Sequence, residues 1–135
     1  MTRFVRAVSV TAGALLLTTC GANEPLGPTP VDQGVIIFIH AGFRGSSQQL
    51  AADISDLGKV EGPCGASEDE SSRTWNDCIS SLRVLPGWRA TLYGDRDFRG
   101  GTIEVTEDVE NLAAVQGTCS GSFNDCISSI RVSRR

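Results

Sequence analysis

An internal repeat spans most of this 135-residue chain and limits the folds that it can adopt. At an offset of 55 in the numbering, Phe43-Arg44-Gly45 recurs as Phe98-Arg99-Gly100. At an offset of 48, the string Asn-Asp-Cys-Ile-Ser-Ser of positions 76–81 recurs at positions 124–129. The offset falls because the first copy has an insertion, which lies in the acidic, serine-rich stretch 65–74. Such self-similarity indicates one supersecondary unit that occurs twice.

Each copy has the sequence pattern of several short strands. Strand-like runs cover residues 35–40 and 89–93, and residues 102–105 alternate in polarity. Each copy closes on Ile-Ser-Ser-(Leu/Ile)-Arg-Val, and one helical turn is expected in each of the segments 53–57 and 108–114. A unit of roughly 50 residues buries too little apolar surface to be stable alone. We therefore predict that two motifs, about 34–86 and 87–135, pack face to face as one all-β sandwich.

The segment 1–33 is expected to lie outside this domain, which begins near Gly34. Arg3 and Arg6 precede an apolar run over residues 7–17, which is about half the length that a membrane-spanning helix needs. This pattern predicts a signal peptide over residues 1–20. Residues 21–33 contain three prolines and few bulky apolar side chains, so we interpret them as an extended tether.

The signal-like run ends in Leu17-Thr18-Thr19-Cys20, which resembles the bacterial lipobox. Thr19 departs from the small residues usual before the lipidated cysteine. The resemblance implies lipidation at Cys20 and a cell-envelope location with the membrane as a partner. Plain secretion is the alternative.

Five cysteines in an exported chain leave one over if the others pair, and Cys20 is the odd one by position. An oxidising compartment favours disulfides among the remaining four. The repeat makes Cys64 with Cys78 and Cys119 with Cys126 the expected pairs, because each would close one loop at the same place in its copy. A zinc site is the competing interpretation, but these spacings contain no C-x-x-C element.

Composition argues against nucleic-acid binding and against catalysis. Without the two arginines of the signal peptide, 12 − 2 = 10 basic residues face 16 acidic ones, so the net charge is near −6. Phosphate binding needs a basic surface, whereas an acidic chain suits a cation. His40 is the only histidine, and paired cysteines offer no nucleophilic thiol. We predict that the chain is not an enzyme.

Two further patterns resemble the βγ-crystallin family, in particular its microbial, calcium-binding members. The family's Greek-key motif carries an aromatic residue, four residues, and then Phe-x-Gly. Here Phe38 precedes Phe43-Arg-Gly45, and Tyr93 precedes Phe98-Arg-Gly100. The calcium-binding members also carry (Asn/Asp)-(Asn/Asp)-x-x-(Ser/Thr)-Ser, which both copies of the repeated string match. The resemblance covers about residues 34–133 and implies two Greek-key motifs in one crystallin-like sandwich.

The resemblance also implies two calcium ions, each held by parts of both motifs. Calcium takes six to eight oxygen ligands, and the string offers a carboxylate, a hydroxyl and backbone carbonyls. Carried over by position, side-chain oxygens come from Asp77, Asp125, Ser80 and Ser128, and backbone carbonyls from Cys78, Cys126, Ala41 and Arg96. Ser81 and Ser129 are expected to bond the folded hairpin, and Trp75, Phe123, Phe38 and Tyr93 to belong to the core. With about one carboxylate per ion, we expect dissociation constants on the order of 10⁻⁵ to 10⁻³ M.

Two alternatives remain open at this stage. The Asp and Ser residues of the string can instead be turn and capping groups that bond their own backbone. The alternative function is peptidase inhibition. Small exported peptidase inhibitors of crystallin-like fold carry a Trp-Asn-Asp string similar to residues 75–77. In an inhibitor, loop 65–74 could enter the cleft of a protease. Besides calcium and the membrane, the expected partners of this protein are therefore an extracellular protease or a component of the cell envelope. The cysteine inside each string would either preorganise or distort the calcium loop.

Overall fold

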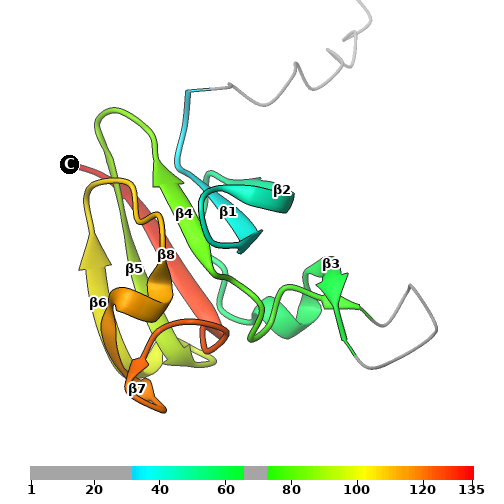
Figure 1. Cartoon of the computed structure of the whole chain (residues 1–135). Coiled ribbons are helices and arrows are strands. Elements are labelled where there is room, and N and C mark those ends of the chain that lie inside the picture. The colour runs from blue at the N-terminus through cyan, green and yellow to red at the C-terminus, as the bar shows by residue number, and fades with distance from the viewer. Residues whose placement is uncertain (1–31, 66–72) are drawn as a thin grey trace, which may run out of the picture.

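The computed structural model describes residues 32–65 and 73–135, and in these the chain forms two packed antiparallel sheets (Figure 1). The first motif contains β1 (Val35–His40), β2 (Arg44–Leu50), the 3₁₀ helix η1 (Leu57–Lys59), β3 (Glu61–Cys64) and β4 (Ser81–Val84). The second contains β5 (Trp88–Asp95), β6 (Arg99–Val105), η3 (Leu112–Ala114), β7 (Gln116–Cys119) and β8 (Ser129–Arg134). The predicted all-β class is confirmed, and η3 lies within the predicted segment 108–114, whereas η1 follows the predicted segment 53–57 and shares only Leu57 with it.

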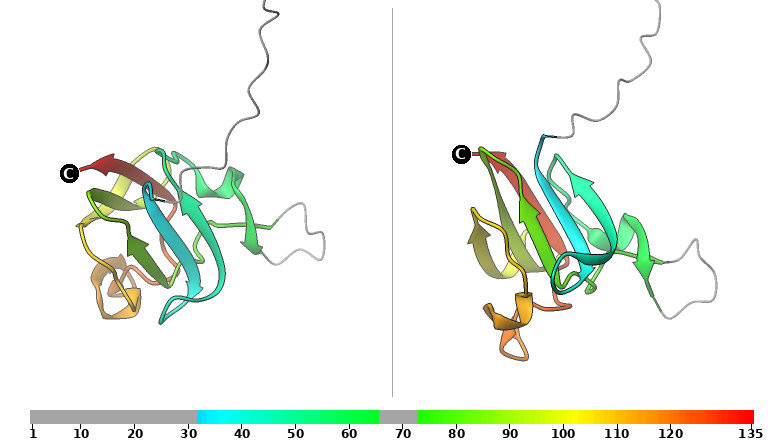
Figure 2. Two further views of the ribbon diagram at one scale, coloured as in Figure 1. Left: turned by 90° about the horizontal axis from the view of Figure 1, so that it is seen from above. Right: turned by 45° about the horizontal axis from the view of Figure 1, so that its top comes forward.

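The two motifs are interlocked as well as stacked. One sheet has the order β2-β1-β4 and the other β6-β5-β8, and they form two layers (Figure 2). Each motif also lends a short segment to the sheet of the other, because Ile54 bridges to Ile130 in β8 and Val109 bridges to Leu82 in β4. Both bridges have two backbone hydrogen bonds of 2.8–3.0 Å. Each sheet therefore ends on a residue of the opposite motif.

Equivalent positions of the two copies fill the core between the sheets. Eight large aliphatic side chains have no exposed surface, and they form four repeat-related pairs: Ile37 and Leu92, Leu57 and Leu112, Ile79 and Ile127, Leu82 and Ile130. Full burial of such a side chain contributes about 1.5–3 kcal/mol. Trp75 and Phe123, at 2% exposure each, close the core beside η1 and η3 as predicted. The repeat thus builds one core from two copies.

Phe38 and Tyr93 are half-buried at the folded hairpins and are not part of the core, which corrects that prediction. Successive side chains of a strand point to opposite faces, so Phe38 faces away from its fully buried neighbour Ile37. Its ring meets Phe43 edge to face with centroids 5.8 Å apart, and the Arg83 guanidinium lies 4.6 Å from the centre of the Phe43 ring. The second copy repeats this arrangement with Tyr93, Phe98 and Arg131.

A buried serine ties each folded hairpin to the closing strand of its motif. Ser81 Oγ donates to the His40 carbonyl at 2.6 Å and accepts from the Phe43 amide at 3.1 Å. Ser129 makes the equivalent bonds, at the same distances, to Asp95 and Phe98. These contacts confirm the structural role predicted for both serines.

The structure pairs Cys64 with Cys78 and Cys119 with Cys126, as the repeat predicted. Their Cα atoms are 6.1 and 5.9 Å apart, within the usual range for disulfides. Each bridge joins the strand that follows the 3₁₀ helix to the repeated string. The loops that carry the candidate ligands are therefore covalently closed.

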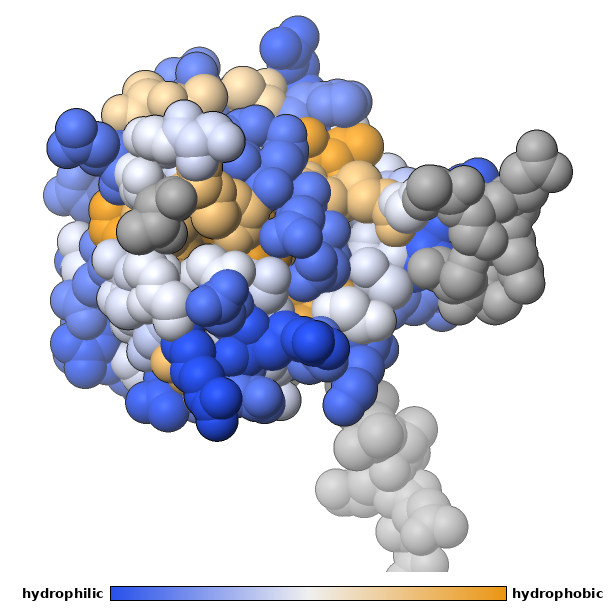
Figure 3. Space-filling model, turned by 90° about the horizontal axis from the view of Figure 1, so that it is seen from below, coloured by the Kyte–Doolittle hydropathy of each residue, from blue (hydrophilic) through white to orange (hydrophobic). Residues whose placement is uncertain are grey.

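One face of the molecule shows hydrophobic atoms only in separate patches among hydrophilic ones (Figure 3). Scattered apolar patches of this kind are normal for a protein surface. Within residues 32–65 and 73–135, no helix has the length and apolar character required to cross a membrane. The predicted signal peptide, Cys20 and nearly all of the tether lie outside the described residues.

Candidate functional site

The aspartates of the repeated string occupy an unusual backbone conformation. Asp77 has φ 53° and Asp125 has φ 50°, in the left-handed region that Asn and Asp tolerate better than most residues. Each amide donates across the motif boundary at 3.2 Å, Asp77 to the Ile127 carbonyl and Asp125 to the Ile79 carbonyl. The turn thus holds each carboxylate against the other copy of the string.

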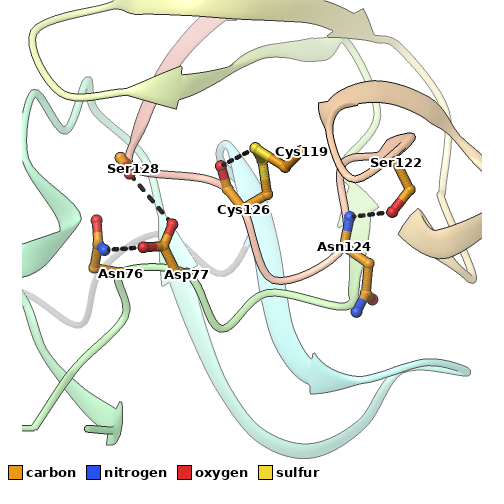
Figure 4. Close-up of a disulfide and its surroundings, with 7 residues drawn as sticks. All are labelled: Asn76, Asp77, Cys119, Ser122, Asn124, Cys126 and Ser128. Atoms are coloured by element: carbon orange, nitrogen blue, oxygen red, sulfur yellow. Dashed lines mark hydrogen bonds between the residues drawn. A yellow bond between two sulfur atoms is a disulfide. The ribbon is translucent and has the colours of Figure 1, made fainter.

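The carboxylates and the string serines pair reciprocally between the motifs. Ser128 Oγ donates to Asp77 Oδ1 at 3.3 Å, and Ser80 Oγ donates to Asp125 Oδ1 at 3.2 Å. Figure 4 shows Asp77 and Ser128 pointing toward one another from different segments. The second oxygen of each carboxylate accepts from the side chain of the preceding asparagine at 2.6 Å. The turn-and-cap alternative would require each aspartate side chain to bond its own local backbone. None of these bonds does so.

These oxygen separations fit the coordination sphere of calcium. Two oxygens bound to one ion at about 2.4 Å and at a right angle lie about 3.4 Å apart. The Asp77–Ser128 and Asp125–Ser80 oxygen pairs, at 3.3 and 3.2 Å, are close to this distance. The serines are 7–8% exposed, while both aspartates are exposed to solvent, so each oxygen pair lies at the protein surface. We name the pairs site 1 (Asp77 with Ser128) and site 2 (Asp125 with Ser80).

Cross-motif hydrogen bonds orient the two predicted hairpin carbonyls. The Asp97 amide donates to the Ser55 carbonyl, and the Gly42 amide donates to the Glu110 carbonyl, both at 2.8 Å. In a trans peptide the N–H and the preceding C=O point in opposite directions, so these bonds also fix the Arg96 and Ala41 carbonyls. At site 2 the Ala41 carbonyl already accepts from Arg44 Nε at 3.1 Å. A calcium ion bound to this oxygen would lie close to the positive charge of the guanidinium, which opposes binding.

Among the described residues, no donor hydrogen-bonds to the predicted cysteine carbonyls. No hydrogen bond to the Cys78 carbonyl occurs within the described part of the chain. The Cys126 carbonyl lies 3.9 Å from Cys119 Sγ (Figure 4), but a disulfide sulfur has no proton to donate. By contrast, the carbonyls of Ser80 and Ser128 are engaged by the amides of Leu112 and Leu57 at 2.9 Å.

Ser128 of site 1 lines a surface hollow, and several of the other lining residues have uncharged equivalents in the second copy. Its lining includes Asp95, Arg96, Asp97 and Ser128, together with Asp56 at the start of η1. Asp56 Oδ1 accepts from the Gly58 amide at 2.9 Å, while its Oδ2 lies 3.8 Å from a guanidinium nitrogen of Arg96 and from Lys59 Nζ. At the equivalent positions of the second site the repeat has Asn111, His40, Ala41 and Gly42.

Sequence reasoning missed Asp56 and Asn111 as neighbours of the sites. Both cap a 3₁₀ helix, since the Asn111 side chain accepts from the Ala113 amide at 2.9 Å just as Asp56 accepts from Gly58. The same repeat offset that relates Phe43 to Phe98 relates Asp56 to Asn111, and that signal was available. Among the described residues, no three His, Cys, Asp or Glu side chains converge as a metal-binding group. A calcium site here therefore depends on serine hydroxyls and backbone carbonyls as well as carboxylates.

Solved structures of similar fold are βγ-crystallin domains. One, from work on the evolution of the eye lens βγ-crystallin domain fold, is 26% identical, with a TM-score of 0.61 over 82% of this chain and 95% of that one. A domain from Flavobacterium johnsoniae is 28% identical, with a TM-score of 0.56 over 75% and 94% of the two chains. The N-terminal domain of Protein S is 27% identical, with a TM-score of 0.55 over 75% and 96%. No family model and no curated protein matches the sequence.

The interlocked sheets, the folded hairpins and these neighbours define a two-motif Greek-key sandwich. The chain folds as a βγ-crystallin domain. The neighbours share a structural, non-enzymatic fold, in agreement with the prediction that this chain is not an enzyme.

Proposed function

We propose that this βγ-crystallin domain binds two calcium ions, each held between the motifs, and is stabilised by them. The observation that carries the proposal is the reciprocal pairing of Asp77 with Ser128 and of Asp125 with Ser80. The residues that would hold the ions are these four, with the carbonyls of Cys78, Cys126, Ala41 and Arg96. When bound, calcium would supply an electrostatic link between two motifs that already share bridging segments.

We further propose that the domain acts outside the cytoplasm, anchored through a lipid on Cys20 or secreted. The signal-like sequence of residues 1–20 and the two disulfides support this location, because disulfides persist in oxidising compartments. Weak sites suit the higher calcium concentrations found outside cells. We propose a structural or protective role in the cell envelope, in which bound calcium stabilises the folded domain.

The fold comparisons do not favour the peptidase-inhibitor alternative. All of the neighbours described above are βγ-crystallin domains. Most of the loop that an inhibitor would insert into a protease, residues 66–72, lies outside the described residues. We therefore do not pursue inhibition as a second function.

Equilibrium dialysis against calcium tests the proposal. We expect two calcium ions per chain, and about one in each of the single variants Asp77→Ala and Asp125→Ala, because each ion has its carboxylate from a different motif. Glu107→Ala is the matched control, since it removes one exposed negative charge that belongs to neither copy of the repeated string, and it should leave two ions bound. Equal binding of magnesium, or unchanged stoichiometry in both aspartate variants, would contradict the proposal.

A further inference from the structure

A groove separates β2 from β3 in the first motif. It is lined by residues 46–48 of β2, by residues 61–63 of β3 and by Trp75. In the second motif β7 lies against β6, whereas β3 stands away from β2 (Figure 1). The disulfide-linked cysteines are 14 residues apart in the first motif and 7 in the second, so the chain after β3 has more length than its counterpart after β7. The groove is thus a feature of the longer copy.

Trp75 provides a hydrogen-bond donor that the second copy lacks. The indole is 2% exposed, and a Cβ added to Gly62 would lie 2.6 Å from its Cδ1, so β3 passes directly over the ring. Within the described part of the chain, the indole N–H has no hydrogen-bond partner, and no fully buried side-chain polar atom is left unpaired. The N–H must therefore reach solvent, and Trp75 lines this groove. The equivalent residue, Phe123, has no such donor.

β2 offers a free strand edge along the same groove. Among the strands that the structure describes, it is the outer strand of its sheet and pairs with β1 alone. An edge strand presents unpaired backbone N–H and C=O groups, to which an extended peptide can add as a further strand. Ser46, Ser47 and Gln48 line the groove on this side with hydroxyl and amide groups. An occupant therefore needs backbone hydrogen-bonding groups and an acceptor oxygen for the Trp75 indole.

The charge of the groove further limits which ligand it can bind. Glu61 is the only charged side chain among the described lining residues, and it is exposed. No ion pair to Glu61 is found within residues 32–65 and 73–135. We propose that the groove binds an extended, basic segment of another polypeptide, which adds to the free edge of β2, accepts a hydrogen bond from Trp75 and pairs with Glu61. This inference does not depend on calcium binding.

The test uses the decapeptide (Lys-Thr)₅ as the probe, with the protein's amide and indole N–H signals followed by NMR in EDTA. We expect the peptide to shift the amides of residues 46–48 and the Trp75 indole, and to leave residues 102 and 103 on the equivalent strand β6 unchanged. A peptide of the same sequence with alternate backbone nitrogens methylated is the matched control. It keeps the charge but loses the donors that strand addition needs, so it should not bind.

Two variants separate the contributions of the groove residues. Trp75→Phe reproduces the residue of the second copy and keeps an aromatic ring in the core, so the protein should fold while its affinity for (Lys-Thr)₅ falls about 2- to 10-fold. Glu61→Gln is a surface change and should weaken binding of this peptide but not of (Ser-Thr)₅. The inference is overturned by absence of shifts at millimolar peptide, by equal shifts on β6, by equal binding of the methylated peptide, or by peptide-independent self-association through β2.

Discussion

Removal of the Cys64–Cys78 disulfide is expected to lower the free energy of unfolding by about 3 kcal/mol, and removal of Cys119–Cys126 by about 2.4 kcal/mol. These values follow from loop-closure entropy in the unfolded chain for separations of 14 and 7 residues. The double variants Cys64→Ala with Cys78→Ala and Cys119→Ala with Cys126→Ala, unfolded in denaturant without calcium, measure the two contributions. Because the bridges occupy equivalent places in the repeat, each serves as the control for the other.

The same variants report how the disulfides affect the candidate sites. Cys78 and Cys126 directly follow the left-handed Asp77 and Asp125, so each bridge restrains the loop that presents its carboxylate. We expect calcium affinity to fall at the site whose aspartate lies beside the removed bridge and to remain at the other. Unchanged stability in both variants, or a larger loss from the shorter loop, would be inconsistent with this account.

Saturating calcium is expected to raise the free energy of unfolding by about 5 kcal/mol. At a concentration 100-fold above the dissociation constant, one site that exists only in the folded state contributes about 2.7 kcal/mol, and two sites contribute twice that. For a domain of this size the thermal midpoint should rise by about 20 °C. Thermal unfolding in EDTA and in calcium measures the difference, with magnesium as the cation control.

The double variant Asp77→Ala with Asp125→Ala should abolish this calcium effect. Alanine at a left-handed φ also strains the turn, so the variant is expected to be less stable than the parent in EDTA. The calcium effect is therefore taken as the difference in stability of the same protein between calcium and EDTA, which excludes the loss caused by turn strain. The pair Asp77→Asn with Asp125→Asn keeps the shape and one carbonyl oxygen, so an intermediate response is expected. A full calcium response in the alanine variant would show that the string is architecture alone.

The repeat made much of the fold predictable. It defined two motifs, placed most strands and paired the cysteines, because equivalent residues occupy equivalent places. It did not reveal that Ile54 and Val109 join the sheet of the opposite motif, since such exchange depends on how the two copies pack. The half-buried position of Phe38 and Tyr93 was also missed, although alternation with the buried Ile37 and Leu92 indicates it.

The candidate site, too, was only partly predictable from the sequence. The string identified Asp77, Ser80, Asp125 and Ser128, but only the fold brings the aspartate of one motif to the serine of the other. The bond from Arg44 Nε to the Ala41 carbonyl depends on a side-chain conformation within the hairpin and has no sequence signature. The opening of the groove over Trp75 likewise required the position of β3.

The most direct test of the calcium proposal is a double-mutant cycle on calcium affinity. If each ion is shared between motifs, Asp77→Ala and Ser128→Ala act on the same ion, so the second change should cost little once the first is present. Asp77→Ala and Ser80→Ala act on different ions, so their effects should add, each confined to its own site. Coupling of Asp77 to Ser80 with independence from Ser128 would contradict the shared-ion arrangement.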